Sequence, residues 1–107
     1  MIWTIEYDSH AVVRFVVGMP DGLLARYLRL TDLMLRFGAD LGMPHTRAMG
    51  NGLFELRVKG KEGIARIFHG TLGRRIVMVH GFIKKSEKTP PKELRIARQR
   101  LAEVEKS

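Results

Sequence analysis

Residues 53–83 read LFELRVKGKEGIARIFHGTLGRRIVMVHGFI. Three runs in this stretch have the length of strands and are rich in β-branched, aromatic and other apolar side chains. They span residues 53–59, 64–69 and 75–83. The breaks between them, Gly60-Lys61-Glu62-Gly63 and Gly70-Thr71-Leu72-Gly73, hold the glycines that tight hairpins need at positive φ. The stretch therefore predicts an antiparallel meander of three strands.

The segments on either side of this meander predict one more strand and three helices. Period-two alternation predicts the strand, and apolar residues at three- and four-residue intervals predict the two longer helices. The expected elements are a strand over residues 2–7, a helix from Ser9 as N-cap to Val17, a helix from Asp21 as N-cap to Gly38, a loop over 39–52 and a last helix capped by Thr89. This order predicts a single α+β domain over residues 1–107, with helices mainly on one face of one sheet.

The composition narrows the classes of partner and of chemistry. The chain has 19 Lys and Arg against 11 Asp and Glu, a net charge of +8 that attracts polyanions such as nucleic acid. It has no cysteine, which excludes disulfides and thiol catalysis, and its four histidines fall in no metal-ligand spacing. We therefore expect neither a metal nor a cofactor. No secretory signal or membrane-spanning run is visible, so we expect a cytoplasmic protein.

Basic residues recur on all three strands of the predicted meander. Glu55, Arg57 and Lys59 share one face of the first strand, and Arg66 lies inside the second. Lys84, Lys85 and Lys88 follow the end of the third strand. Because neighbouring strands lie about 5 Å apart, these cations are expected to form one phosphate-binding patch. The alternative is a solvated sheet face on which the charges only keep the protein in solution.

Three main segments of the chain, and a looser fourth, resemble one group of small bacterial proteins. Residues 51–58 look like the "GLxELR" strand of the phage-derived HigB-like toxins, and residues 65–68 resemble the "YRxxY" strand of the wider RelE/ParE superfamily. Residues 80–90 are similar to the HigB-like segment "HGFxKKTxKTP", and residues 37–45 look like the loop before its strands. Together these segments cover most of residues 30–100 in the right order.

The resemblance implies a RelE-like fold and a function in a type II toxin–antitoxin system. In this chemistry the 2′-hydroxyl of a translated mRNA attacks the adjacent phosphate in the ribosomal A site without a metal. By motif position, Arg66 matches the arginine that contacts the scissile phosphate. Arg57 matches a basic position on the preceding strand, and Lys85 matches the basic residue after the last strand. Lys59, Lys84 and Lys88 are then expected to bind flanking phosphates.

The residues that transfer protons are left open by the sequence. RelE has a lysine where Arg57 stands, and arginine is a poor base because it is never appreciably neutral. The tyrosine that RelE places near its C-terminus has no clear counterpart here. Glu55 is one candidate base, with an ion pair to Arg57 or Lys59 as its alternative role. His80 is a second candidate, because the intrinsic pKa of histidine suits acid–base catalysis. Its alternative role is that of a hydrogen-bonded structural residue.

Two further functions compete with the mRNA endoribonuclease. The ParE branch shares the fold and inhibits DNA gyrase without catalysis, and a plain RNA-binding module needs only the basic patch. Clustered Arg57, Arg66 and Lys85 favour the nuclease, because a gyrase inhibitor has no transition-state charge to stabilise. The expected partners are mRNA, the ribosome and a cognate antitoxin of helix-turn-helix type that offers acidic or apolar surface.

Overall fold

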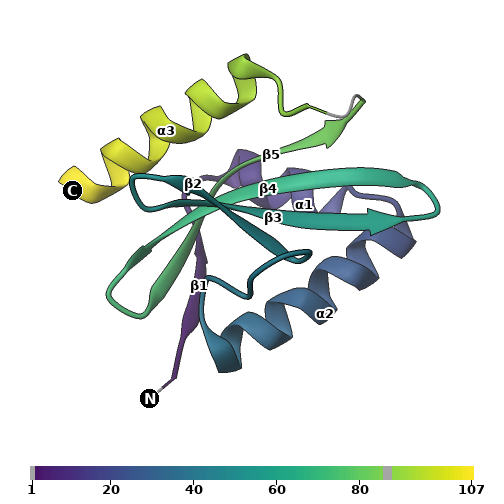
Figure 1. Ribbon diagram of the computed structural model, residues 1–107, viewed down its shortest axis with the longest axis horizontal. Helices are drawn as coiled ribbons and strands as arrows, with labels where there is room; N and C mark the ends of the chain where they lie inside the picture. The colour runs from purple at the N-terminus through teal and green to yellow at the C-terminus, as the bar shows by residue number, and fades with distance from the viewer. Residues whose placement is uncertain (1, 86–87) are drawn as a thin grey trace.

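The computed structural model describes residues 2–85 and 88–107 (Figure 1). Met1, Ser86 and Glu87 lie outside the described residues, the last two within the segment 80–90 discussed above. The elements are β1 (Thr4–Tyr7), α1 (His10–Val17), α2 (Asp21–Phe37), β2 (Thr46–Gly50), β3 (Leu53–Gly60), β4 (Gly63–Leu72), β5 (Arg75–Lys84) and α3 (Pro91–Lys106). This is an α+β arrangement compatible with a RelE-like fold, as predicted.

The strands form one five-stranded sheet in the order β1-β5-β4-β3-β2. The predicted meander is confirmed, since β3, β4 and β5 pair antiparallel in sequence order. The sheet is mixed rather than antiparallel throughout, because β1 pairs parallel with β5. Between β1 and β2 the chain crosses the whole sheet through α1 and α2, so that these two strands lie at opposite edges.

Helices cover both faces of the sheet, which corrects the expectation that they pack mainly on one. Figure 1 shows α2 and α3 on opposite sides of the strands. Leu56 and Val58 of β3 pack in the core under α1 and α2, whereas Leu53 packs with Ala97 and Leu101 of α3. β4 and β5 are likewise apolar on both faces over much of their length, and a strand buried on both faces needs a helix layer on each. The face that α3 covers is called the α3 face below.

Two local predictions around the meander are wrong. The expected loop 39–52 contains β2, which pairs with the first half of β3 and ends in a bulge next to Gly50. The expected turn at Gly70-Thr71-Leu72-Gly73 is too long, because β4 continues to Leu72. A Cβ on Gly70 would lie 2.4 Å from Cδ1 of Leu101, so this glycine permits close packing of α3 rather than a turn.

The capping predictions also need correction. Ser9 is the N-cap of α1 as predicted, although its side chain makes no capping hydrogen bond. Pro20, not Asp21, is the N-cap of α2, and Pro90, not Thr89, is the N-cap of α3. Proline fixes its own φ, and ψ is 148° at Pro20 and 135° at Pro90, the non-helical backbone that an N-cap has; the Thr89 hydroxyl is used elsewhere, as described below.

The turn between β3 and β4 supplies the missing cap of α2. The Gly22 backbone N–H donates a 2.9 Å hydrogen bond to Oε2 of Glu62. A carboxylate at a helix N-terminus satisfies a free N–H and complements the helix dipole. Because this contact joins the end of β3 to the start of α2, it also fixes the distance between the basic residues of these two elements.

We expect Glu62→Ala to lower the free energy of unfolding by about 1 kcal/mol, the usual cost of losing a capping acceptor. Urea denaturation of the purified protein measures this. Glu62→Gln retains an acceptor oxygen and should lose less. Lys61→Ala, an exposed neighbour in the same turn, is the control; equal unfolding midpoints for Glu62→Ala and Lys61→Ala would contradict the capping role.

Candidate functional site

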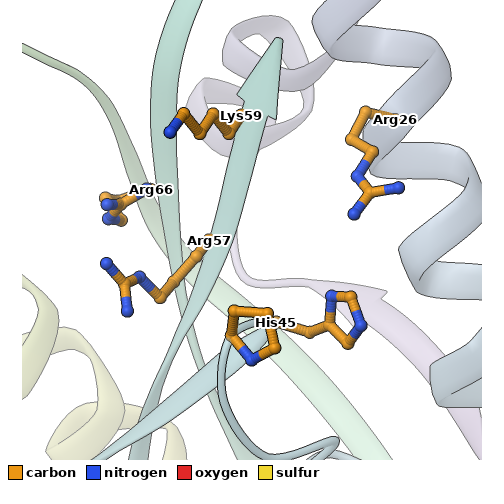
Figure 2. Close-up of a pocket in the computed structure, with 6 residues that line it drawn as sticks. Arg26, His45, Arg57, Lys59 and Arg66 are labelled. Atoms are coloured by element: carbon orange, nitrogen blue, oxygen red, sulfur yellow. The ribbon is translucent and has the colours of Figure 1, made fainter.

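The basic residues of β3 and β4 meet on the α3 face through the register of the two strands. Arg57 lies directly opposite Arg66, and Lys59 lies opposite Ile64. Directly paired residues of antiparallel strands project to the same side of the sheet. Figure 2 accordingly shows the guanidinium groups of Arg57 and Arg66 on the same side of the β3 ribbon. These two residues are called the arginine pair.

The arginine pair is a close one. The Arg57 backbone N–H points away from β4 and donates a 2.8 Å hydrogen bond to the His45 carbonyl. Arg57 and Arg66 therefore form a non-hydrogen-bonded pair, the type in which the side chains approach most closely. Like charges directly across two strands destabilise a sheet. A bound anion between the two guanidinium groups would remove that repulsion.

Arg66 is a buried cation that is only partly neutralised. It is 4% exposed, and its Nε lies 3.6 Å from Oε1 of Glu55. Nη1 donates to the Ala65 carbonyl at 3.2 Å, while Nε has no hydrogen-bond partner among the described residues. Burial lowers the pKa of Arg66, the Glu55 carboxylate raises it and the charge of Arg57 lowers it. The guanidinium remains charged at neutral pH and holds donor capacity for a ligand.

Glu55 is enclosed between β4 and the segment that leads into α3. Its side chain is 2% exposed, and Oε2 accepts a 2.7 Å hydrogen bond from the Thr89 hydroxyl. Its ion pair is with Arg66, not with Arg57 or Lys59, because the diagonal cross-strand neighbour lies within reach of its carboxylate. Both carboxylate oxygens of Glu55 thus contact side chains of the protein itself, those of Arg66 and Thr89. A carboxylate engaged in this way holds its neighbours in position.

His80 is held by α3 in the row next to Arg66, since His80 pairs with Phe68 whereas Arg66 pairs with Phe82. Nε2 lies 2.7 Å from Oε1 of Glu93, and Nδ1 lies 3.3 Å from Nη1 of Arg100. Since Arg100 has no acceptor, Nδ1 accepts and Nε2 donates, which fixes the neutral tautomer in this arrangement. The ring stacks over Phe68 at 6.4 Å. These contacts match the hydrogen-bonded structural alternative that the sequence left open for His80.

The lysines predicted to bind phosphate extend the basic surface along the α3 face. Lys59, Ile64 and Lys84 form one row across β3, β4 and β5, next to the row that contains the arginine pair. Lys85 and Lys88 are exposed and lie beyond the end of β5. Register therefore brings Lys59 and Lys84 alongside Arg57 and Arg66, with the other two lysines at the end of the row.

A cavity of about 250 Å³ opens beside the arginine pair. It is lined by Arg26, Pro44, His45, Arg57, Lys59 and Arg66 and is called the cationic cavity (Figure 2). Four of the six lining residues are Arg or Lys and none is acidic. Such a hollow has the charge and the donors to hold a phosphodiester.

Sequence reasoning missed Arg26 and His45 in the cavity, and Arg47 on the neighbouring strand β2. Arg26 belongs to α2, where periodicity indicates only a residue of the outer face. His45 and Arg47 belong to the segment expected to be a loop, yet register places Arg47 opposite Glu55 on the α3 face. β2 could have been found only from its pairing with β3, since it is short and the residues on either side of it are those of a loop.

Comparisons with known proteins identify a family. The model of the family described as phage derived protein Gp49-like (DUF891) matches residues 14–102. None of the curated proteins that were compared matches the chain. Within residues 2–85 and 88–107, no helix is long and apolar enough to cross a bilayer, and no three His, Asp or Glu gather to hold a metal ion.

Proposed function

The chain belongs to the phage-derived Gp49-like family, a RelE-like toxin family, and on that premise we propose that it is the toxin of a type II toxin–antitoxin pair. The proposed activity is metal-independent cleavage of mRNA on the ribosome. Within the family, the segments quoted from residues 51–58 and 80–90 support the HigB-like group. The proposed place of action is the cytoplasm, where translated mRNA is found.

The arginine pair carries the proposal. Two guanidinium groups face each other across β3 and β4, one of them 4% exposed, at the wall of a cavity without a carboxylate. Such a pair costs folding free energy, whereas a phosphate between the two groups would satisfy both cations at once. A phosphodiester that becomes more negative during reaction would gain further from them, which is the requirement for catalysis by charge stabilisation.

The proposed reaction divides between the RNA and the protein. The 2′-oxygen loses its proton and forms a bond to phosphorus, the bond from phosphorus to the 5′-oxygen breaks, and the leaving oxygen gains a proton. Arg66 and Arg57 hold the non-bridging oxygens and stabilise their added charge. Lys59 and Lys84, with Lys85 and Lys88 beyond them, bind neighbouring phosphates. Glu55 and His80 are assigned positioning roles, because their polar atoms are engaged by Arg66, Thr89, Glu93 and Arg100.

We expect Arg57→Gln to separate function from stability. Removing one of two like charges should leave the free energy of unfolding unchanged or raise it by about 0.2–1 kcal/mol. The same change should lower the rate of mRNA cleavage in a translating extract by at least about tenfold, since one of two phosphate ligands is lost. Urea denaturation and primer extension on extracted transcripts measure the two effects.

Arg74→Gln is the matched control for this experiment. Arg74 is exposed in the turn after β4 and lies over the ring of Trp3, away from the cationic cavity. Equal cleavage by Arg57→Gln, Arg74→Gln and the unchanged protein would overturn the proposal. Intact transcripts together with inhibited gyrase supercoiling would instead support the ParE-like function, and RNA binding without cleavage would support a plain binding module.

The proposed partner is an antitoxin encoded beside this chain, of the helix-turn-helix type. The net charge of +8 favours an acidic partner surface. Exposed apolar side chains on α1 and α2, among them Val17 and Leu28, favour an apolar one. Co-expression of the adjacent gene, with rescue of growth as the readout, tests the pairing.

A further inference from the structure

The cationic cavity continues around the free edge of β3. The pairing of β2 with β3 reaches from Gly50 and Leu53 to Thr46 and Leu56. The backbone hydrogen bond from Arg57 to His45 closes that ladder, so the described strands leave the outer edge of β3 beyond Arg57 without a neighbour. A ligand on the α3 face can therefore pass this edge toward the opposite face without crossing a strand.

Arg26 meets the cavity from that opposite face. Arg26 lies on α2, which packs on the face of the sheet opposite the α3 face, and its side chain is half-buried. Figure 2 shows Arg26 and His45 on one side of the β3 ribbon and the arginine pair on the other. Pro44 and His45 add two rings to the wall between them. Cations thus lie on both sides of the outer edge of β3, with the flat rings of Pro44 and His45 between them.

We propose that this region is a second RNA subsite, for the nucleotide next to the cleaved phosphodiester. The inference rests on the proposed function and extends it. The scissile phosphate lies at the arginine pair, the strand turns around the edge of β3, and the adjacent phosphate pairs with Arg26. The sugar or base of the intervening nucleotide packs on Pro44 and His45, since rings bind nucleotides of any sequence by stacking.

The arrangement selects single-stranded RNA. A strand that turns around a sheet edge must separate its two phosphates from any complementary strand, and a duplex is too stiff and wide to follow that path. The subsite also makes binding depend on length, because a dinucleotide with one phosphodiester can occupy the arginine pair or Arg26 but not both. A longer oligonucleotide occupies both and gains from the second contact.

The test measures binding of fluorescein-labelled, 2′-O-methyl oligoribonucleotides, which cannot be cut because their 2′-oxygens carry no proton. Fluorescence anisotropy is recorded for a dinucleotide and a hexanucleotide over a series of salt concentrations. Arg26→Gln should weaken hexanucleotide binding about fivefold and reduce the slope of log K against log salt by about 0.7, the value for one phosphate of a single strand. Binding of the dinucleotide should change less than twofold.

Arg29→Gln is the matched control, because Arg29 is exposed on the same helix and does not line the cavity. It should bind both oligonucleotides as the unchanged protein does. His45→Ala should weaken hexanucleotide binding without changing the salt slope, since it removes a stacking surface and not a charge contact. The subsite is overturned if Arg26→Gln binds the hexanucleotide normally, or if Arg29→Gln loses as much as Arg26→Gln.

Arg57→Gln distinguishes failure of the subsite from failure of the proposed function. It should weaken both oligonucleotides, because it alters the site of the scissile phosphate. If Arg57→Gln bound both oligonucleotides normally, that result would contradict the proposed function itself. If Arg57→Gln bound the oligonucleotides more weakly while Arg26→Gln bound the hexanucleotide normally, only the proposed subsite would be contradicted.

Discussion

Arg66→Ala is expected to abolish growth arrest on expression and to lower the rate of mRNA cleavage in a translating extract by about 10²–10³-fold. That range is the usual cost of removing one fixed donor that stabilises transition-state charge. The effect should exceed that of Arg57→Gln, because Arg66 is the more buried of the pair and its charge is less screened by water. Primer extension on a defined transcript measures the rate.

The same change also removes the cation beside a buried carboxylate, so folding must be measured separately. Without Arg66, Glu55 retains its Thr89 hydrogen bond but has no counter-charge within ion-pair distance among the described residues. Arg66→Lys keeps the charge and the fold but loses the planar fork of donors that binds phosphate. It should unfold near the midpoint of the unchanged protein and still lose most of the cleavage. Normal cleavage by a folded Arg66→Lys and a folded Arg66→Ala would refute the role of Arg66.

Glu55→Ala is expected to lower the free energy of unfolding by about 3–5 kcal/mol, the cost of leaving a buried charge without its partner. The Glu55 carboxylate is the acidic group of β3 that faces Arg66, and it also holds Thr89 just before α3. Domains of this size are stable by about 5–15 kcal/mol, so the loss is a large fraction of the total. Urea denaturation followed by circular dichroism gives the value.

Two milder variants separate a positioning role of Glu55 from a role as general base. Thr89→Val keeps the carboxylate and removes only the hydrogen bond, whereas Glu55→Gln keeps the hydrogen bond and removes the charge. As a positioning residue, Glu55 should give variants with reduced cleavage but with the same dependence of the rate on pH. If Glu55 were the base, Glu55→Gln alone would lose the acidic limb of the pH profile, and Thr89→Val would cleave normally.

The clustered cations that suit the site for binding phosphate also lower the stability of the fold. Two arginines opposite each other and a nearly buried guanidinium lower the stability of the sheet, and Glu55 offsets only part of that cost. Leu53, Phe68 and Val79 lie on the same face as the site, where α3 covers them. The protein thus places its like charges at one end of a face whose other end is a hydrophobic core.

Much of the fold follows from local patterns in the sequence. Apolar and β-branched runs on either side of Gly60 and Gly73 specify the meander, and periodic leucines specify the helix from Asp21 to Phe37. These signals work because each depends on residues that are neighbours in the chain. The alternation of β3 likewise predicts Arg57 and Lys59 on one face, where the structure has them.

What the sequence left undetermined depends on contacts between distant segments. β2 forms because β3 offers it a partner, and β1 is parallel to β5 because two helices carry the chain across the sheet. The sequence alone determined the three helices, the first strand, the meander and which cations lie on the meander, but not β2, since backbone geometry repeats every two or 3.6 residues and needs no distant partner. Only the tertiary structure decided that Arg26 and His45 join them in one cavity and that Glu55 and His80 turn inward, because pairing register and helix packing bring together residues that are far apart in the chain.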